Sequence, residues 1–162
     1  MVNNSAIVCI IDKITKKNGQ PCKKTLQKIV FLIEAKKVDL GCDFGIHFYG
    51  PYSADLDFAV HELCDENILK IDYTPMDHLI SVVDSSASNE YSNEIVDEVI
   101  ASFGQESPTE LELIATSLYV YLQTKSRCNI SAGVKKLKGD KYPDSRISAA
   151  IVKLENNGYL SI

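Results

Sequence analysis

Residues 46–63, with the sequence IHFYGPYSADLDFAVHEL, join a strand-like run to an amphipathic helix through a sharp corner. Ile46, Phe48 and Tyr49 form a short apolar run, which Gly50-Pro51 are expected to end. Ser53 is suited to cap the helix that follows, because serine favours the N-cap and its side chain accepts from an orphan amide. The apolar positions of that helix recur at helical spacing, at Leu56, Ala59, Val60 and Leu63. A strand that leads directly into a helix predicts a fold with both kinds of element.

The remaining elements follow from periodicity and from their end signals. Helices are expected at residues 4–17, with Asn3, Asn4 or Ser5 as N-cap, and at 23–37, with Leu26, Ile29 and Val30 inside and Lys28 on the solvent face. Residues 68–73 and 79–83 flank a proline-containing turn and predict a hairpin. Helices are then expected at 93–103, from 107 through 122 with a capping box, at 130–137 and from 143 to 157, followed by a short strand at 159–162.

The predicted fold class is mainly α with a small β-hairpin or sheet (α+β), in one compact unit. Residues 1–85 would form a winged-helix-like module with residues 68–84 as the wing, packed against a helical half at 90–162 that ends in a helix-turn-helix-like unit. A shift of 91 residues superimposes the apolar positions of the last helix on those of the helix after Ser53. This repetition indicates either a duplicated unit or the periodicity shared by any helix that leads into a strand.

Composition and motifs exclude several classes. Five cysteines without a C-x-x-C pair indicate reduced, buried thiols in a cytoplasmic protein. No apolar run approaches the roughly 18 residues of a membrane span, and the first residues predict a helix rather than a signal peptide. Asp57 and His61 share one helix face, as metal ligands, as a base and its orienter or, the favoured interpretation, as an exposed pair. No nucleophile motif, phosphate loop or metal spacing is present, so we expect no enzyme, no metal and no cofactor.

The charges are segregated along the chain. Residues 1–41 carry a net +5, residues 42–112 carry −15, and residues 113–162 carry +5. The helix after Ser53 is acidic and bears no Lys or Arg, which makes it unsuited to duplex DNA and a candidate surface for a protein partner. Its acidic residues are Asp55, Asp57, Glu62, Asp65 and Glu66. The candidate nucleic-acid-binding residues lie near the C-terminus and are Lys135, Lys136, Lys138, Lys141, Arg146 and Lys153, unless they form only a solvated face.

Two segments resemble a known family. They are KTLQKIVFL at residues 24–32 and the corner YGPYS at residues 49–53, with Leu56 three residues further on. Together they resemble the bacterial and archaeal YwgA-like proteins, which are similar to the SocA or Panacea antitoxin-like domain. The resemblance covers roughly residues 20–75 and implies a winged-helix-like prokaryotic or phage protein, of which some relatives neutralise a toxin by protein contact. The motif residues are expected to determine the fold, with Tyr49 at the edge of the core and a polar role for Gln27 and Lys28. The full set is Leu26, Gln27, Lys28, Tyr49, Gly50, Pro51 and Ser53.

The first hypothesis for function is a non-enzymatic, antitoxin-like regulatory protein that binds a protein partner through its acidic helix. The alternative is a nucleic-acid-binding transcriptional regulator that uses the basic C-terminal unit. Unpaired edges on the predicted wing and on the last strand would allow a homodimer. No membrane association is expected.

Overall fold

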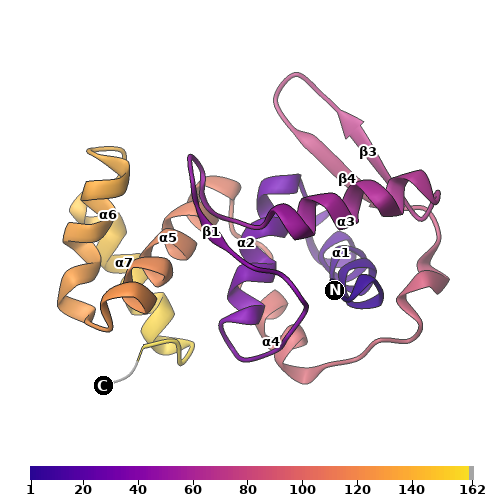
Figure 1. Cartoon of the computed structure of the whole chain (residues 1–162). Coiled ribbons are helices and arrows are strands. Elements are labelled where there is room, and N and C mark those ends of the chain that lie inside the picture. Colours follow the sequence, from indigo (N-terminus) through magenta and orange to yellow (C-terminus); the bar gives the residue numbers. More distant parts are fainter. Residues whose placement is uncertain (161–162) are drawn as a thin grey trace.

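The computed structural model describes residues 1–160, in which helices predominate and the strands form two antiparallel hairpins (Figure 1). This confirms the mainly helical α+β fold class. The winged-helix-like character of residues 1–85 stays a prediction. In chain order the elements are α1 (Asn4–Asn18), α2 (Lys23–Glu34), β1 (Gly45–His47), β2 (Gly50–Tyr52), α3 (Ala54–Asp65), β3 (Leu69–Tyr73), β4 (His78–Val82), α4 (Glu94–Phe103), α5 (Pro108–Thr124), α6 (Ile130–Lys138) and α7 (Asp144–Asn156).

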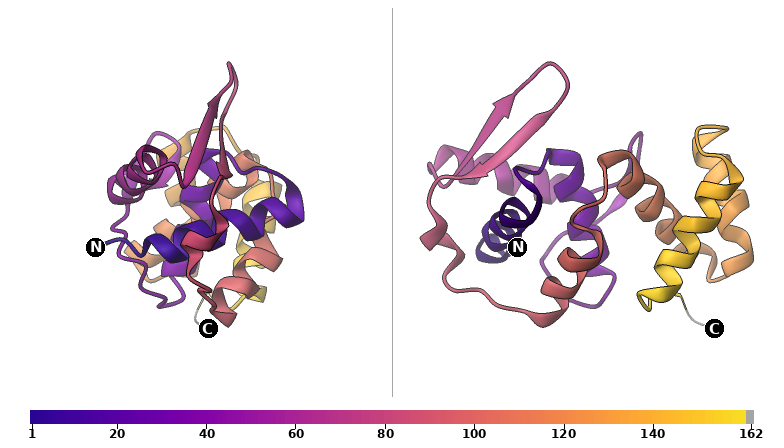
Figure 2. Two further views of the ribbon diagram at one scale, coloured as in Figure 1. Left: turned by 90° about the vertical axis from the view of Figure 1, so that its right-hand side faces the viewer. Right: turned by 180° about the vertical axis from the view of Figure 1, so that it is seen from behind.

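Helices α2 and α5 occupy the centre of the molecule. Helix α2 packs against α4, α5 and β2, while α5 also contacts α6 and α7. Figure 2 shows α6 and α7 at one end and the β3–β4 hairpin projecting from the other. One hydrophobic core contains buried residues of both halves, from Ile7 on α1 to Leu154 on α7. The two halves therefore share a core.

The predicted helix starts are explained by side-chain caps. The Asn3 Oδ1 atom accepts from the Ala6 amide at 3.0 Å, and Ser53 Oγ accepts from the Leu56 amide at 3.2 Å. Ser107 Oγ accepts from the Glu110 amide at 3.1 Å, with Pro108 as the first residue of α5. Each cap pairs an amide that the helix itself leaves unsatisfied.

The corner after β1 differs from its prediction. Gly50 and Pro51 belong to β2, where they pair with His47 and Ile46, so the prediction that they end the strand is wrong. Proline fits because both strands of a two-stranded hairpin are edge strands. Gly50 has φ +95°, and a Cβ atom there would lie 2.8 Å from Thr116 Oγ1 on α5. Tyr49 occupies the turn and is 46% exposed, rather than covering the edge of the core.

Helix α2 buries more polar surface than its pattern predicts. Leu26, Ile29 and Val30 are buried as expected, but Lys28 is only 2% exposed, so its predicted place on the solvent face is wrong. The face that carries Lys28 is covered because α2 packs against both β2 and α5. The helix ends at Glu34, three residues before the predicted end at residue 37.

The C-terminal strand predicted at residues 159–162 is not formed by its described part. Tyr159 and Leu160 lie outside any strand and are buried, and the Tyr159 hydroxyl donates to the Leu32 carbonyl oxygen at 2.7 Å. Residues 161 and 162 lie outside the described part of the chain. Helices α6 and α7 themselves form as predicted.

Candidate functional site

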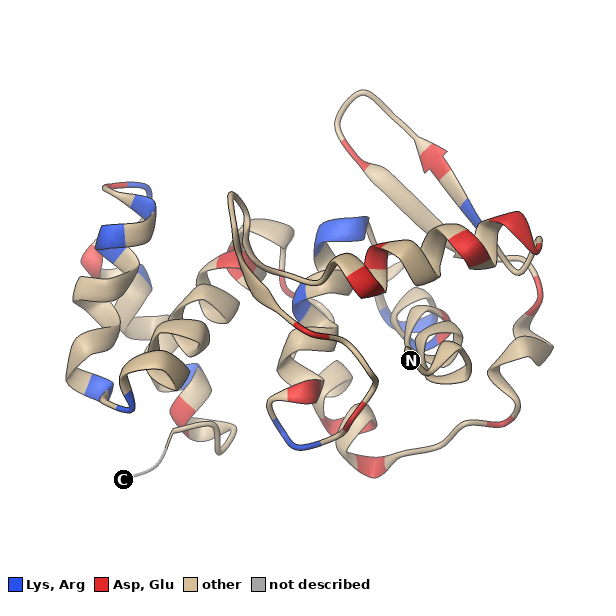
Figure 3. Ribbon diagram, in the orientation of Figure 1, with Lys and Arg blue, Asp and Glu red and all other residues tan. Residues whose placement is uncertain are grey.

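The outer face of α3 gathers most of the predicted acidic surface. Asp55, Glu62, Asp65 and Glu66 are exposed, and within residues 1–160 none of them forms an ion pair. Phe58 lies on the same face at helical spacing and is 66% exposed. Figure 3 shows the acidic residues along α3. We call these five residues the α3 face, an acidic surface with one large aromatic side chain at its centre.

Asp57 is the one predicted acidic residue that does not share this face. Its Oδ1 atom lies 2.9 Å from Lys23 Nζ on α2, and its Oδ2 atom lies 3.8 Å from His61 Nε2. Lys23 Nζ also lies 3.1 Å from His61 Nε2. The lysine therefore occupies the place that a metal would need between Asp57 and His61.

The β3–β4 hairpin lies next to α3 and carries exposed apolar side chains of its own. Helix α3 packs against β3, and the hairpin extends away from the helices (Figure 1). Tyr73 is 64% exposed, and Met76 in the turn is 87% exposed. Exposed aromatic and methionine side chains are typical of protein-binding surfaces.

The predicted basic cluster is largely neutralised by carboxylates. Lys136 is exposed and forms no ion pair with any described residue. The other five pair as Lys135 with Asp144, Lys138 and Lys141 with Glu112, Arg146 with Glu110, and Lys153 with Glu106. Four of these pairs, those of Lys138, Lys141, Arg146 and Lys153, join the α6–α7 segment to carboxylates in the first turns of α5 or just before it. The structure thus places four of the six basic residues along one seam between α5 and the α6–α7 segment, while Lys135 pairs with Asp144 outside it.

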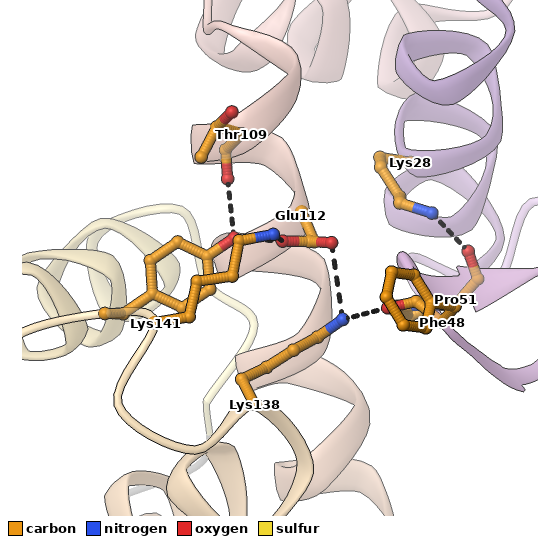
Figure 4. Close-up of polar contacts among 8 residues, drawn as sticks. Lys28, Phe48, Pro51, Thr109, Glu112, Lys138 and Lys141 are labelled. Atoms are coloured by element: carbon orange, nitrogen blue, oxygen red, sulfur yellow. Dashed lines mark hydrogen bonds and ion pairs between the residues drawn. The ribbon is translucent and has the colours of Figure 1, made fainter.

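Glu112 is the centre of that seam (Figure 4). It is 4% exposed, and its carboxylate accepts from Lys138 at 3.3 Å, from Lys141 at 2.6 Å and from the Tyr142 hydroxyl. Burial raises the pKa of Glu112, but the hydrogen bonds from Lys141 and Tyr142 outweigh it, so the net pKa lies below the ordinary value. Burial and the same carboxylate raise the pKa of Tyr142 far above its usual range. Glu112 is therefore a buried anion held by two cations.

Gln27 makes a buried polar contact between α2 and the start of α3. Its Nε2 atom donates to the Ser53 carbonyl oxygen at 3.0 Å, and its Oε1 atom accepts from the Ser53 amide at 2.8 Å. Both residues are buried. This bidentate contact fixes the start of α3 against the middle of α2, which is a structural function.

A cavity of about 310 Å³ opens between α2 and the β1–β2 hairpin. Lys23, Lys24 and Lys28 line it from α2, and Asp57 lines it from α3. The Lys28 ammonium donates to the Pro51 carbonyl oxygen at 2.7 Å, and Lys24 Nζ lies 3.8 Å from the centre of the Tyr49 ring. Burial lowers the pKa of Lys28 to about 8. The cavity therefore has a cationic wall in which Lys24 and Lys28 form no ion pair with a carboxylate of residues 1–160.

The described residues offer little reactive chemistry elsewhere. Residues 1–160 contain no group of three His, Cys, Asp or Glu residues that could hold a metal ion, and no helix among them is long and apolar enough to cross a membrane. Cys9, Cys22 and Cys42 are buried free thiols, as predicted, whereas Cys128 is exposed. Burial raises the pKa of Cys42 to about 12, which keeps this thiol protonated and unreactive at neutral pH.

Fold and surfaces together define a mainly helical α+β protein with an acidic helix face and a cationic cavity. The chain matches no family model and none of the curated proteins with which it was compared. Its resemblance to the YwgA-like proteins stays a prediction that rests on residues 24–32 and 49–53.

Three features of these surfaces were missed by sequence reasoning. The burial of Lys28 and the carboxylate partners of the basic cluster depend on contacts between distant segments. The place of Phe58 had a local signal, because position 58 is out of phase with the apolar positions 56, 59, 60 and 63. A large aromatic residue on the polar side of an acidic helix indicates a binding surface.

Proposed function

We propose that this chain is a non-enzymatic, antitoxin-like regulatory protein that binds a basic protein partner through the α3 face. The observation that carries the proposal is the exposure of Phe58 among four acidic residues that form no ion pairs in the described chain. Unpaired charge around an aromatic anchor suits a partner with a basic rim and an apolar pocket. The toxin-neutralising role comes from the family resemblance.

The partner is to be identified by site-specific crosslinking. A photoreactive phenylalanine analogue at position 58 is expected to capture a basic protein in the cells that encode this chain. The same analogue at Val152, which is 47% exposed on α7, serves as the control position. Capture of the same protein from both positions would contradict a site on α3.

Affinity for the purified partner is then measured by calorimetry with charge and anchor variants. Phe58→Ala is expected to weaken binding about tenfold or more, because buried aromatic anchors dominate interface energetics. The double variant Asp55→Lys, Glu62→Lys is expected to weaken it further and to reverse its salt dependence. The matched control is Glu94→Lys, Glu98→Lys on α4, a different helix on which both residues are exposed. Equal losses in the two charge-reversed proteins would exclude a specific α3 surface.

The nucleic-acid-binding alternative makes a different prediction for a labelled random duplex. Because five of the six candidate basic residues already pair with carboxylates, we expect no saturable binding even at about 50 mM salt. Fluorescence anisotropy measures this directly. Binding that weakens steeply toward about 200 mM salt, and that is lost on reversal of Lys135, Lys136 and Arg146, would replace the present proposal with a transcriptional regulator.

A further inference from the structure

The ammonium group of Lys28 is buried without an anionic partner. It has three donors, of which one is directed to the Pro51 carbonyl oxygen, and no carboxylate among the described residues lies within ion-pair distance. Glu112 attracts it electrostatically, but that carboxylate already accepts from Lys138, Lys141 and Tyr142. Proteins seldom bury an unpaired charge unless something else completes the site.

Space for a missing anion adjoins this ammonium. Lys28 lines the cavity of about 310 Å³ described above and also a smaller one of about 70 Å³, and Lys24 and Tyr49 line both. In the larger cavity, three lysines face a single carboxylate, Asp57, which is committed to Lys23. Lys24 and Lys28 thus remain as two cations one helical turn apart, and the first turn of α2 adds the positive end of its dipole.

The opposite wall of the cavity is aromatic. The β1–β2 hairpin contributes His47, Phe48, Tyr49 and Tyr52, and Phe48 in its turn is 83% exposed. The ring centres of His47 and Tyr52 lie 4.7 Å apart, and those of Phe48 and Tyr49 lie 4.9 Å apart. Aromatic faces bind planar rings by stacking. A ligand that satisfies both walls therefore has an anionic group at one end and a planar ring at the other.

From this juxtaposition we propose that the cavity between α2 and the β1–β2 hairpin binds a free mononucleotide, with its phosphate between Lys24 and Lys28 and its base against the aromatic side chains of the hairpin. Cationic donors at this spacing suit a phosphate, which accepts several charge-assisted hydrogen bonds. A volume of about 310 Å³ lies at the lower end of the range for ligand cavities, which fits one nucleotide and not a longer strand. This site is independent of the α3 face.

Calorimetric titration of the full chain with AMP, GMP, CMP, UMP, adenosine, inorganic phosphate and a single-stranded oligonucleotide tests the proposal. Saturable binding of at least one mononucleotide is expected, about tenfold or more tighter than inorganic phosphate or adenosine. Backbone amide spectra should place the shifts at Lys24, Lys28 and Gly50. The proposal is overturned if no mononucleotide binds, or if phosphate alone binds as tightly. It is equally overturned if only an oligonucleotide binds, which would indicate a strand-binding surface.

Variants distinguish the contribution of the phosphate to binding from that of the base. Lys28→Met and Lys24→Met keep most of the side-chain volume and are each expected to weaken nucleotide binding about tenfold or more. Tyr49→Ala is expected to weaken nucleotide binding more than it weakens phosphate binding. Lys136→Met, at an exposed lysine without an ion pair, is the matched control. Retention of full affinity by both Lys24→Met and Lys28→Met, with folding verified by circular dichroism, would refute the site.

Discussion

Replacing Glu112 with glutamine is expected to lower the free energy of unfolding by about 3–5 kcal/mol, because it leaves the buried ammonium of Lys138 without its anion. The largest cost is expected at Lys138, because its side chain is only 7% exposed and its ammonium would keep the Phe48 carbonyl oxygen as its remaining acceptor. Lys141 is 45% exposed and can turn to water. Equilibrium unfolding in urea at pH 7 measures the change, with the slope of the transition as a check that the two-state behaviour is kept.

The matched control for this change is Glu110→Gln. Glu110 lies in the same turn of α5 and pairs with Arg146, but that guanidinium is 46% exposed. Solvent screens such a pair, so it contributes little to stability. A loss at Glu112 no larger than the loss at Glu110 would contradict the view that Glu112 holds the seam together. The double variant Glu112→Gln, Lys138→Met should recover part of the loss, because it removes the uncompensated ammonium together with the carboxylate.

The effect of Glu112 also depends on pH in a defined direction. Its pKa in the folded state is lowered, so the unfolded chain takes up a proton first as the pH falls. The stability that the carboxylate contributes is therefore fully present above the ordinary pKa range of glutamate. It is lost as the pH falls through the lower folded-state pKa, and the difference between the wild type and Glu112→Gln should shrink over that interval.

Local signals were sufficient to predict most of the elements. Asn3, Ser53 and Ser107 each cap a helix by a short-range hydrogen bond, so the sequence around them contains the whole cause of the helix start. The β3–β4 hairpin is similarly predicted by its two β-branched runs and the turn between them. These elements need no knowledge of the rest of the chain.

Sequence patterns failed where burial is decided by distant segments. Lys28 shares the phase of Lys24 on α2, and only the packing of β2 and α5 over that face distinguishes the buried lysine from a solvated one. The pairing of charges across the seam is likewise decided by distant segments. The net charges of residues 42–112 and 113–162 suggested one acidic surface and a separate basic one. The carboxylates at 106, 110 and 112 and the cations at 138–153 instead neutralise each other in space. Segment charge therefore overstated the free basic surface.

The burial of Lys28 leads to a second large effect, in which the wild type gains stability as the pH rises. The pKa of Lys28 falls from 10.5 to about 8 on folding, with burial as the main cause, so between these values the unfolded chain binds the additional proton. Glu112 opposes this shift, whereas Lys138 and Lys24 reinforce it. The difference in unfolding free energy between the wild type and Lys28→Met should therefore rise by about 2 kcal/mol from pH 7 to pH 10.

Thermal or urea unfolding of both proteins across this pH range gives that difference directly, and other titrating groups cancel in it. Lys136→Met, which removes an exposed lysine that forms no ion pair with a described residue, is the matched control variant. A constant difference for Lys28→Met would mean that its ammonium carries no desolvation penalty, and the motive for an anionic ligand beside it would disappear. A rise that a bound mononucleotide abolishes would show that the ligand supplies the missing negative charge, because binding then returns the pKa of Lys28 toward that of the unfolded chain.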